Sequence, residues 1–142
     1  MDVSISRFTT EHLPALREIF LSVRQKTFYW FENKRFELNS FDTETEGEFI
    51  LVAHAGNSVA GFLSVWLADN FIHHLYIKNE YQNLGIGTAL LTAIKQKLNS
   101  PITLKCLKKN EPAIAFYKKH GFREKECGLS KDGEYILFEC VF

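Results

Sequence analysis

The stretch YQNLGIGTALL, residues Tyr81–Leu91, decides the fold because two glycines stand where a helix begins. Its second half has helical spacing, yet a glycine such as Gly85 or Gly87 costs a helix interior about 1 kcal/mol relative to alanine. Glycine has no Cβ, so its backbone can approach a ligand closely. A helix N-terminus adds unpaired N–H groups and about half a positive charge. The stretch therefore predicts a phosphate cradle whose bare main-chain amides touch the ligand.

Two other phosphate loops do not fit this stretch. A P-loop requires Gly-Lys-Ser/Thr at the helix start, whereas Gly87 is followed directly by Thr88. A dinucleotide-binding fingerprint requires a third glycine three residues after Gly87, and Leu90 occupies that position. What remains is a Q-x-x-G-x-G pattern that runs from Gln82 to Gly87.

Hydrophobic periodicity on either side of the glycines predicts a mixed α/β order of elements. The run Asn70–Lys78 is apolar on both sides, which is typical of a central strand. Gly56 and Asn57 mark a hairpin turn, and Asn110 or Glu111 caps a helix that Gly121 ends. The expected elements are a strand at Val3–Phe8, a helix at His12–Gln25 capped by Thr10, a hairpin within Glu48–Leu67, the Asn70–Lys78 strand, a helix at Gly85–Asn99, a strand at Ile102–Leu107, a helix up to Gly121, and a closing antiparallel pair.

Composition limits the class of protein. The 142 residues suit one domain, and 46% hydrophobic residues suffice for a packed core. The formal net charge of zero argues against a nucleic-acid partner, and no apolar run approaches the roughly 18 residues of a membrane span. The N-terminal residues lack the apolar core of a signal peptide. Cys106, Cys127 and Cys140 form no CxxC pair, so we expect free thiols in a cytoplasmic protein.

Charge is unevenly distributed along the chain. Basic residues dominate Lys95–Lys125, whereas acidic residues dominate Glu32–Glu48. These runs are either two solvated faces, or a basic side for an anionic cofactor and an acidic side for a cationic substrate.

Two motifs resemble the GNAT superfamily of acyl-CoA-dependent N-acetyltransferases. LYIKNEYQNLGIGTALL (Leu75–Leu91) is similar to the family's acetyl-CoA segment L-x-V-x-P-x-x-Q/R-x-x-G-x-G, with Ile77 for the valine and Asn79 for the usual proline. NEPAIAFYKKHGF (Asn110–Phe122) is similar to its second motif, N-x-x-A-x-x-F-Y-x-x-x-G-F. The resemblance implies one domain over residues 1–142, with a mixed, mostly antiparallel central sheet of about seven strands flanked by about four helices.

The resemblance also implies direct acetyl transfer from acetyl-CoA to an amine in a ternary complex, with no metal. Main chain on the strand before the glycines would pair with the pantetheine arm, and one N–H there would polarise the thioester carbonyl. Tyr117 would protonate the leaving thiolate; the alternative is that it is a core aromatic residue on an amphipathic helix. Asn110 would bind the cofactor, cap its helix, or do both. The implied cofactor contacts are Leu75, Tyr76, Ile77, Gln82, Asn83, Leu84, Gly85, Ile86, Gly87, Thr88, Asn110 and Tyr117.

The group that removes the amine proton is left open by the sequence. An amine with a pKa of about 10.4 is protonated at neutral pH and must lose a proton before it attacks. The glutamate that some relatives carry before the second motif is missing from Lys105–Leu107. His73 or His74, on the strand where some relatives place a histidine, or a water molecule, remains as base. His73 shares strand parity with Leu75, but a bulge would reverse that assignment.

The acceptor is a small-molecule or peptide amine that the sequence does not identify. The aromatic stretch Phe28–Phe31 forms either one wall of the amine site or part of the core, and we expect at least two of its rings in the core. Two other functions stay open: a non-catalytic acyl-CoA-binding or sensing module, and a peptide or protein N-terminal acetyltransferase. Many members of the family pair, so the resemblance also allows a homodimer.

Overall fold

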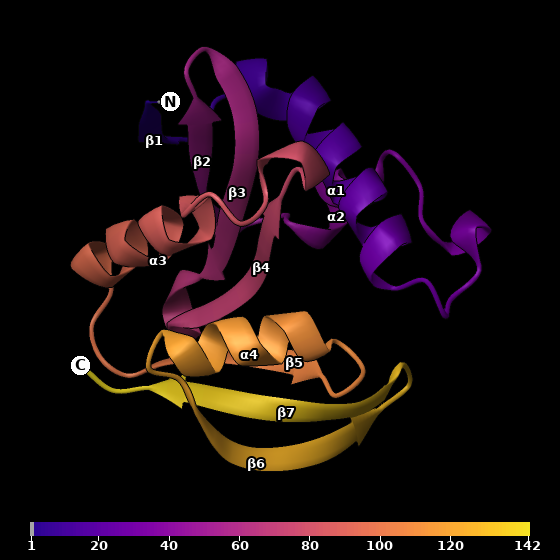
Figure 1. Cartoon of the computed structure of the whole chain (residues 1–142), viewed down its shortest axis with the longest axis vertical. Coiled ribbons are helices and arrows are strands. Elements are labelled where there is room, and N and C mark those ends of the chain that lie inside the picture. The colour runs from indigo at the N-terminus through magenta and orange to yellow at the C-terminus, as the bar shows by residue number, and fades with distance from the viewer. Residues whose placement is uncertain (1) are drawn as a thin grey trace.

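A computed structural model describes residues 2–142, with Asn33 described by its backbone alone. Its elements follow the predicted order almost without exception (Figure 1). The strands are β1 (Val3–Arg7), β2 (Phe49–Ala55), β3 (Ser58–Trp66), β4 (Phe71–Ile77), β5 (Ile102–Leu107), β6 (Arg123–Ser130) and β7 (Gly133–Cys140); the α-helices are α1 (Leu13–Thr27), α2 (Ser40–Glu44), α3 (Ile86–Lys97) and α4 (Glu111–Lys119).

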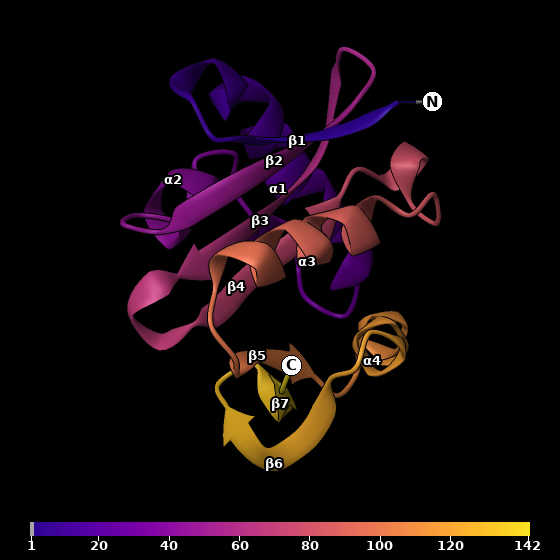
Figure 2. The same cartoon turned by 90° about the vertical axis from the view of Figure 1, so that its left-hand side faces the viewer.

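The strands form one sheet in the order β1-β2-β3-β4-β5-β7-β6. Only the β4–β5 pair is parallel among the pairs in the described residues. Figure 2 shows that this pair joins two wings, β1–β4 and β5–β7, which diverge from one another. The predicted fold class, a mostly antiparallel mixed sheet with helices on its faces, is confirmed.

Each face of the sheet carries its own apolar cluster. One cluster joins α3 and the C-terminal wing around Leu90, Ile94 and Phe138. The other joins α1 and α2 to the sheet around Phe20 and Phe62. Burial of both clusters fixes the faces of β4, the strand that lies between them, and so determines where its side chains point.

The N-terminal helix differs in detail from the prediction. The segment Thr10–His12 forms a 3₁₀ turn, and α1 begins only at Leu13. The backbone N–H of Thr9 donates to His12 Nδ1 at 3.0 Å, so Thr9, not Thr10, occupies the N-cap position of this turn. Local side-chain hydrogen bonds of this kind set helix boundaries that hydrophobic spacing does not report.

Two further features were expected from composition. Cys106 and Cys140 are buried free thiols, and Cys127 is an exposed one. Across residues 2–142, none of the helices combines the length and apolar character needed to cross a membrane.

Candidate functional site

The central feature is an opening between β4 and β5. These strands pair only at Phe71 with Thr103 and at Ile72 with Leu104, and then they part (Figure 1). From His74 to Ile77, β4 pairs with β3 along one edge, while the β5 ladder along its other edge has ended at Ile72. An open strand edge presents main-chain donors and acceptors that an extended ligand can use.

Alternation along β4 decides which backbone groups face this open edge. Lys78 N–H donates to Ala60 O at 2.7 Å, and two residues earlier Tyr76 lies opposite Phe62. Hydrogen-bonded pairs alternate in an antiparallel ladder, so the backbone groups of Tyr76 face β3, whereas those of Leu75 and Ile77 face the opening. The expectation of main-chain contacts from all three residues is therefore narrowed to Leu75 and Ile77.

The side chain of Gln82 shapes the turn that follows β4. Its Nε2 donates to Ile77 O at 3.0 Å and lies 3.3 Å from Asn79 Oδ1. The side chain of Gln82 therefore stabilises the turn after β4. Its place in the motif has a structural reason independent of any ligand.

The start of α3 is an uncapped helix terminus. Gly85 occupies the N-cap position with φ +82°, and no side chain caps the helix. The first-turn N–H groups, on Ile86, Gly87 and Thr88, lack intrahelical acceptors as in any α-helix. Asn83 and Gly85 both have positive φ and are exposed together with Leu84. These amides and the helix dipole create an anion-binding surface next to the end of β4.

The two glycines do different things. A Cβ on Gly85 would meet no atom within 4 Å, so the residue is required by its left-handed backbone and not by crowding. A Cβ on Gly87 would lie 3.0 Å from Phe116 Cζ, so this glycine lets α3 approach α4. Gly87 thus has a packing reason of its own, and the prediction that its backbone approaches a ligand stays a prediction.

Residues of the second motif border the same opening. Asn110 is the N-cap of α4, and its Oδ1 accepts the N–H of Ala113 at 3.4 Å. Tyr117 is 9% exposed and packs against Phe122 and Phe138. Burial raises the pKa of Tyr117 well above its usual value, so its phenol stays protonated at neutral pH.

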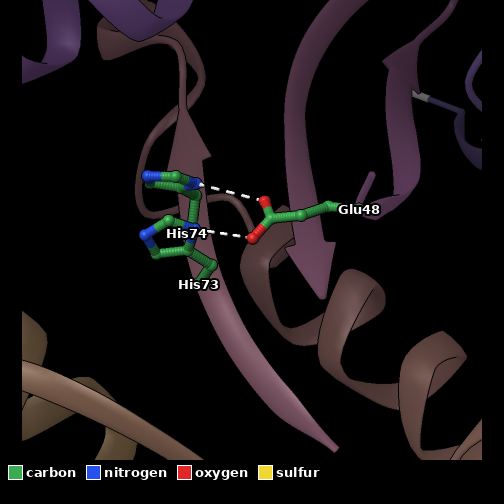
Figure 3. A group of neighbouring side chains, drawn as sticks. All are labelled: Glu48, His73 and His74. Atoms are coloured by element: carbon green, nitrogen blue, oxygen red, sulfur yellow. Dashed lines mark hydrogen bonds and ion pairs between the residues drawn. The ribbon is translucent and has the colours of Figure 1, made fainter. Parts of the chain in front are cut away.

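His73 and His74 meet a carboxylate that the sequence did not suggest. Glu48, which directly precedes β2, lies 2.6 Å by its Oε2 from His73 Nδ1 and 3.8 Å by its Oε1 from His74 Nδ1 (Figure 3). His74 is buried and hydrogen-bonded to Ser64 Oγ at 2.9 Å, whereas His73 is exposed. No local pattern marks Glu48, because the contact joins segments 25 residues apart.

The aromatic stretch Phe28–Phe31 is not part of the core. None of its rings belongs to either apolar cluster of the described residues, which contradicts the expectation of at least two core rings. Trp30 and Phe31 instead line a cavity of about 520 Å³ together with Leu107 at the end of β5. An ion pair between Arg35 and Asp132 ties this stretch to the β6–β7 turn. The cavity therefore lies at the C-terminal end of β5, against the β6–β7 turn.

A second cavity of about 620 Å³ lies on another flank of the sheet. It is lined by Ile5–Arg7 of β1 and by the Ala89–Lys97 side of α3. None of the predicted site residues lines it.

The family model described as the acetyltransferase (GNAT) family matches residues 11–122. Two solved structures share the fold: a GCN5-related N-acetyltransferase of Rhodopseudomonas palustris and the PaiA N-acetyltransferase of Thermoplasma acidophilum in complex with coenzyme A. The first has a TM-score of 0.82 at 16% identity, covering 100% of this chain and 97% of that one. The second has a TM-score of 0.81 at 20% identity, covering 100% of both chains.

A curated relative is similar over a shorter segment. The peptidyl-lysine N-acetyltransferase YiaC of Escherichia coli K12 is 31% identical over 67 residues, which are 47% of this chain and 44% of that protein. The chain thus spans less than half the length of that curated relative.

Proposed function

Because the chain belongs to the acetyltransferase (GNAT) family, we propose that it transfers an acetyl group from acetyl-CoA to a primary amine. Transfer is direct, with both substrates bound in one ternary complex. One observation carries the proposal: the open edge of β4 leads within a few residues into the uncapped start of α3. An extended arm and a diphosphate require these two surfaces in this order.

The cofactor lies along the opening. Its pantetheine arm pairs with the backbone of Leu75 and Ile77 like an added strand, and its diphosphate accepts N–H groups from Asn83–Thr88. The Thermoplasma acidophilum structure, which shares the fold over its whole length, is a complex with coenzyme A, and this supports coenzyme A as the kind of cofactor bound here. Asn110 adds a side-chain contact at the start of α4, where its amide nitrogen is not used by the cap.

Transfer needs an oxyanion donor, a base and an acid. The backbone N–H of Leu75 faces the opening and polarises the thioester carbonyl as negative charge develops on its oxygen. His73, the first residue of β4 beyond the β5 ladder, takes the amine proton. Tyr117 lies in the same apolar cluster as Leu75 and Ile77 and donates to the departing sulfur. Burial keeps the phenol protonated before transfer, and the negative charge that develops on the sulfur is what draws the proton from it.

The acceptor amine enters by the cavity that Trp30 and Phe31 line. Apolar lining from Leu107, Leu129 and the Trp30 ring fits the apolar body of an acceptor. The curated relative is named for acetylating peptidyl-lysine, so a peptide amine is one acceptor class to test beside small amines. The scheme uses no metal. Free thiols suit the reducing cytoplasm in which we place the enzyme, and a homodimer stays a prediction.

Mass-spectrometric screening of amines and peptides with acetyl-CoA tests the proposal. Wild-type protein should acetylate part of the panel, and Tyr117→Phe should lower turnover by on the order of 10²-fold while coenzyme A binding persists. Calorimetry with coenzyme A supplies the matched binding measurement. Coenzyme A binding without turnover of any panel member would identify a non-catalytic acyl-CoA-binding module instead.

A further inference from the structure

Glu48 is a buried carboxylate without a full set of partners. Its side chain is 5% exposed, and its Oε1 has no hydrogen-bond donor among the described residues. A charge buried to this extent is costly unless a cation or strong donors compensate it. Its Oε2 has such a donor in His73 Nδ1, at 2.6 Å. The carboxylate therefore has a specific interaction with the more exposed of the two imidazoles.

A β-bulge brings both histidines to this carboxylate. Ser64 pairs with His74 and the next residue, Val65, pairs with Ile72, so His73 is the extra residue of β4. Successive residues of a regular strand point to opposite faces, but here the two imidazole centroids are only 3.9 Å apart. Bulges re-aim side chains and are frequent beside active sites. The irregularity of β4 is thus what aims the Nδ1 atom of His73 at Glu48.

Glu48, His73 and His74 each offer a metal-ligand atom within 4.8 Å of the others, but a hydrogen-bonded pair accounts for the distances better than a metal ion does. Two histidines and a glutamate are zinc-type ligands, but ligand atoms on a tetrahedral zinc with bonds of about 2.0–2.1 Å lie about 3.3 Å apart. His73 Nδ1 and Glu48 Oε2 are at hydrogen-bonding distance, and His74 Nδ1 is already 2.9 Å from Ser64 Oγ. The arrangement fits a hydrogen-bonded pair with a neighbouring ring.

We propose that Glu48 is a positioning residue that accepts the Nδ1–H of His73 and thereby keeps the lone pair of His73 on Nε2. This inference rests on the proposed transfer function. Figure 3 shows the far ring nitrogens of both histidines pointing away from Glu48. The bond made at one imidazole nitrogen fixes which nitrogen can act as base. Glu48 then acts on the reaction only through His73.

The proton balance follows from that tautomer. The ammonium form of the amine first releases one proton to water, and the neutral nitrogen then bonds to the thioester carbon while the C–S bond breaks and its electron pair leaves with sulfur. The amine proton passes to His73 Nε2, and the imidazolium so formed is stabilised by the Glu48 carboxylate. Tyr117 protonates the thiolate, and water returns the proton of His73 to the tyrosinate. The products are the amide and free coenzyme A.

His74 makes its hydrogen bond to Ser64, so the carboxylate of Glu48 interacts mainly with His73. Its ring is 6% exposed, and burial lowers its pKa well below the usual value, with contributions from His73 and Arg24. A neutral His74 is hydrogen-bonded to Ser64 and packs against the His73 ring. It does not compete with His73 for the carboxylate of Glu48.

The tautomer of His73, read by long-range ¹H–¹⁵N NMR of the full chain, tests the inference directly. Wild type should show the Nδ1–H form, and Glu48→Ala should lose it. The same variant should lower kcat by on the order of 10²-fold with unchanged acetyl-CoA affinity. Glu48→Gln keeps an acceptor but not the charge, so it should retain the tautomer and recover part of kcat. Glu46→Ala, which removes an exposed carboxylate two residues away, should match wild type.

Two outcomes overturn the inference, and a third overturns the transfer function alone. An Nε2–H tautomer in wild type does so without any variant, which covers the case in which Glu48→Ala fails to fold. Activity that EDTA abolishes and Zn²⁺ alone restores would make Glu48 a metal ligand. If wild type turns over no amine while Glu48→Ala still switches the tautomer, the transfer function fails and the coupling of Glu48 to His73 stands.

Discussion

The two sides of the opening are built from different material. In the proposed scheme the cofactor side is mainly the continuous run Leu75–Thr88, whose proposed contacts are main-chain groups. The proposed acceptor side draws on two separate features, the cavity lined by Trp30 and the Glu48–His73 pair beside the buried His74. Amides do not titrate, whereas the acceptor side carries a carboxylate and imidazoles. Acid, backbone strain and side-chain truncation should therefore act on the two sides separately.

Acid should weaken the protein through the acceptor side. Burial, His73 and Arg24 lower the pKa of His74 well below its usual value, and the carboxylate of Glu48 does not offset them. A histidine whose pKa is depressed on folding adds stability above its unfolded pKa of about 6.5 and loses that stability as pH falls below it. We expect His74 to lower the free energy of unfolding by up to about 1.4 kcal/mol per pH unit in that range.

Urea unfolding at pH values from about 7.5 to about 5.0 measures this slope. His74→Gln should flatten it. The pKa of His120 is also lowered by burial and by Lys119 and Lys95, but His120 lies on the cofactor side and is less buried, so His120→Gln should change the slope less. An identical slope in wild type and His74→Gln would place the acid sensitivity elsewhere.

The cofactor side should respond to its backbone. Gly85→Ala with Gly87→Val should weaken acetyl-CoA binding more than tenfold, about 1.4 kcal/mol, while the fold survives. The first change strains a residue at φ +82°, and the second presses on Phe116 and shifts the helix that presents the amides. Calorimetry on variants with native circular dichroism measures the loss. Undiminished affinity would count against the cradle.

Gly85 and Gly87 show which features of the site could be predicted from the sequence and which could not. A local pattern predicted the turn, the uncapped helix and the anion-binding surface, because all three depend on a few consecutive residues. The strand and helix order followed from periodicity for the same reason. The packing of Gly87 against Phe116 depends on how two helices meet, and no spacing within the motif reports that contact.

The acceptor side was correspondingly harder to predict. Glu48 reaches His73 only because β2, β3 and β4 pair in a particular register with a bulge at His73. The rings of Phe28–Phe31 had the composition of a core segment, yet tertiary placement left them lining a cavity. In both cases the deciding contacts join distant segments, so hydrophobicity and spacing could not supply them.

Truncating the aromatic wall should affect the acceptor alone. Trp30→Ala removes a ring that lines the cavity, so KM for the amine should rise about fivefold, about 1 kcal/mol, with acetyl-CoA affinity unchanged. Steady-state kinetics with each substrate varied in turn measures both constants. Trp66→Ala is the matched control, since Trp66 is 43% exposed and does not line that cavity. Equal losses for both substrates would remove the distinction between the two sides.

The smallest effect is expected at Cys106, which lies between the two sides on β5. Burial raises the pKa of its thiol to about 11, so at neutral pH it is not a thiolate nucleophile. Cys106→Ala should change kcat by less than about twofold, less than about 0.4 kcal/mol. Mass spectrometry of wild type mixed with acetyl-CoA should find no acetyl group on Cys106, with exposed Cys127 as the internal control for adventitious acetylation. An acetylated Cys106 that transfers its group to the amine would replace direct transfer by a two-step reaction, and the opening between β4 and β5 would then serve sequential rather than simultaneous binding.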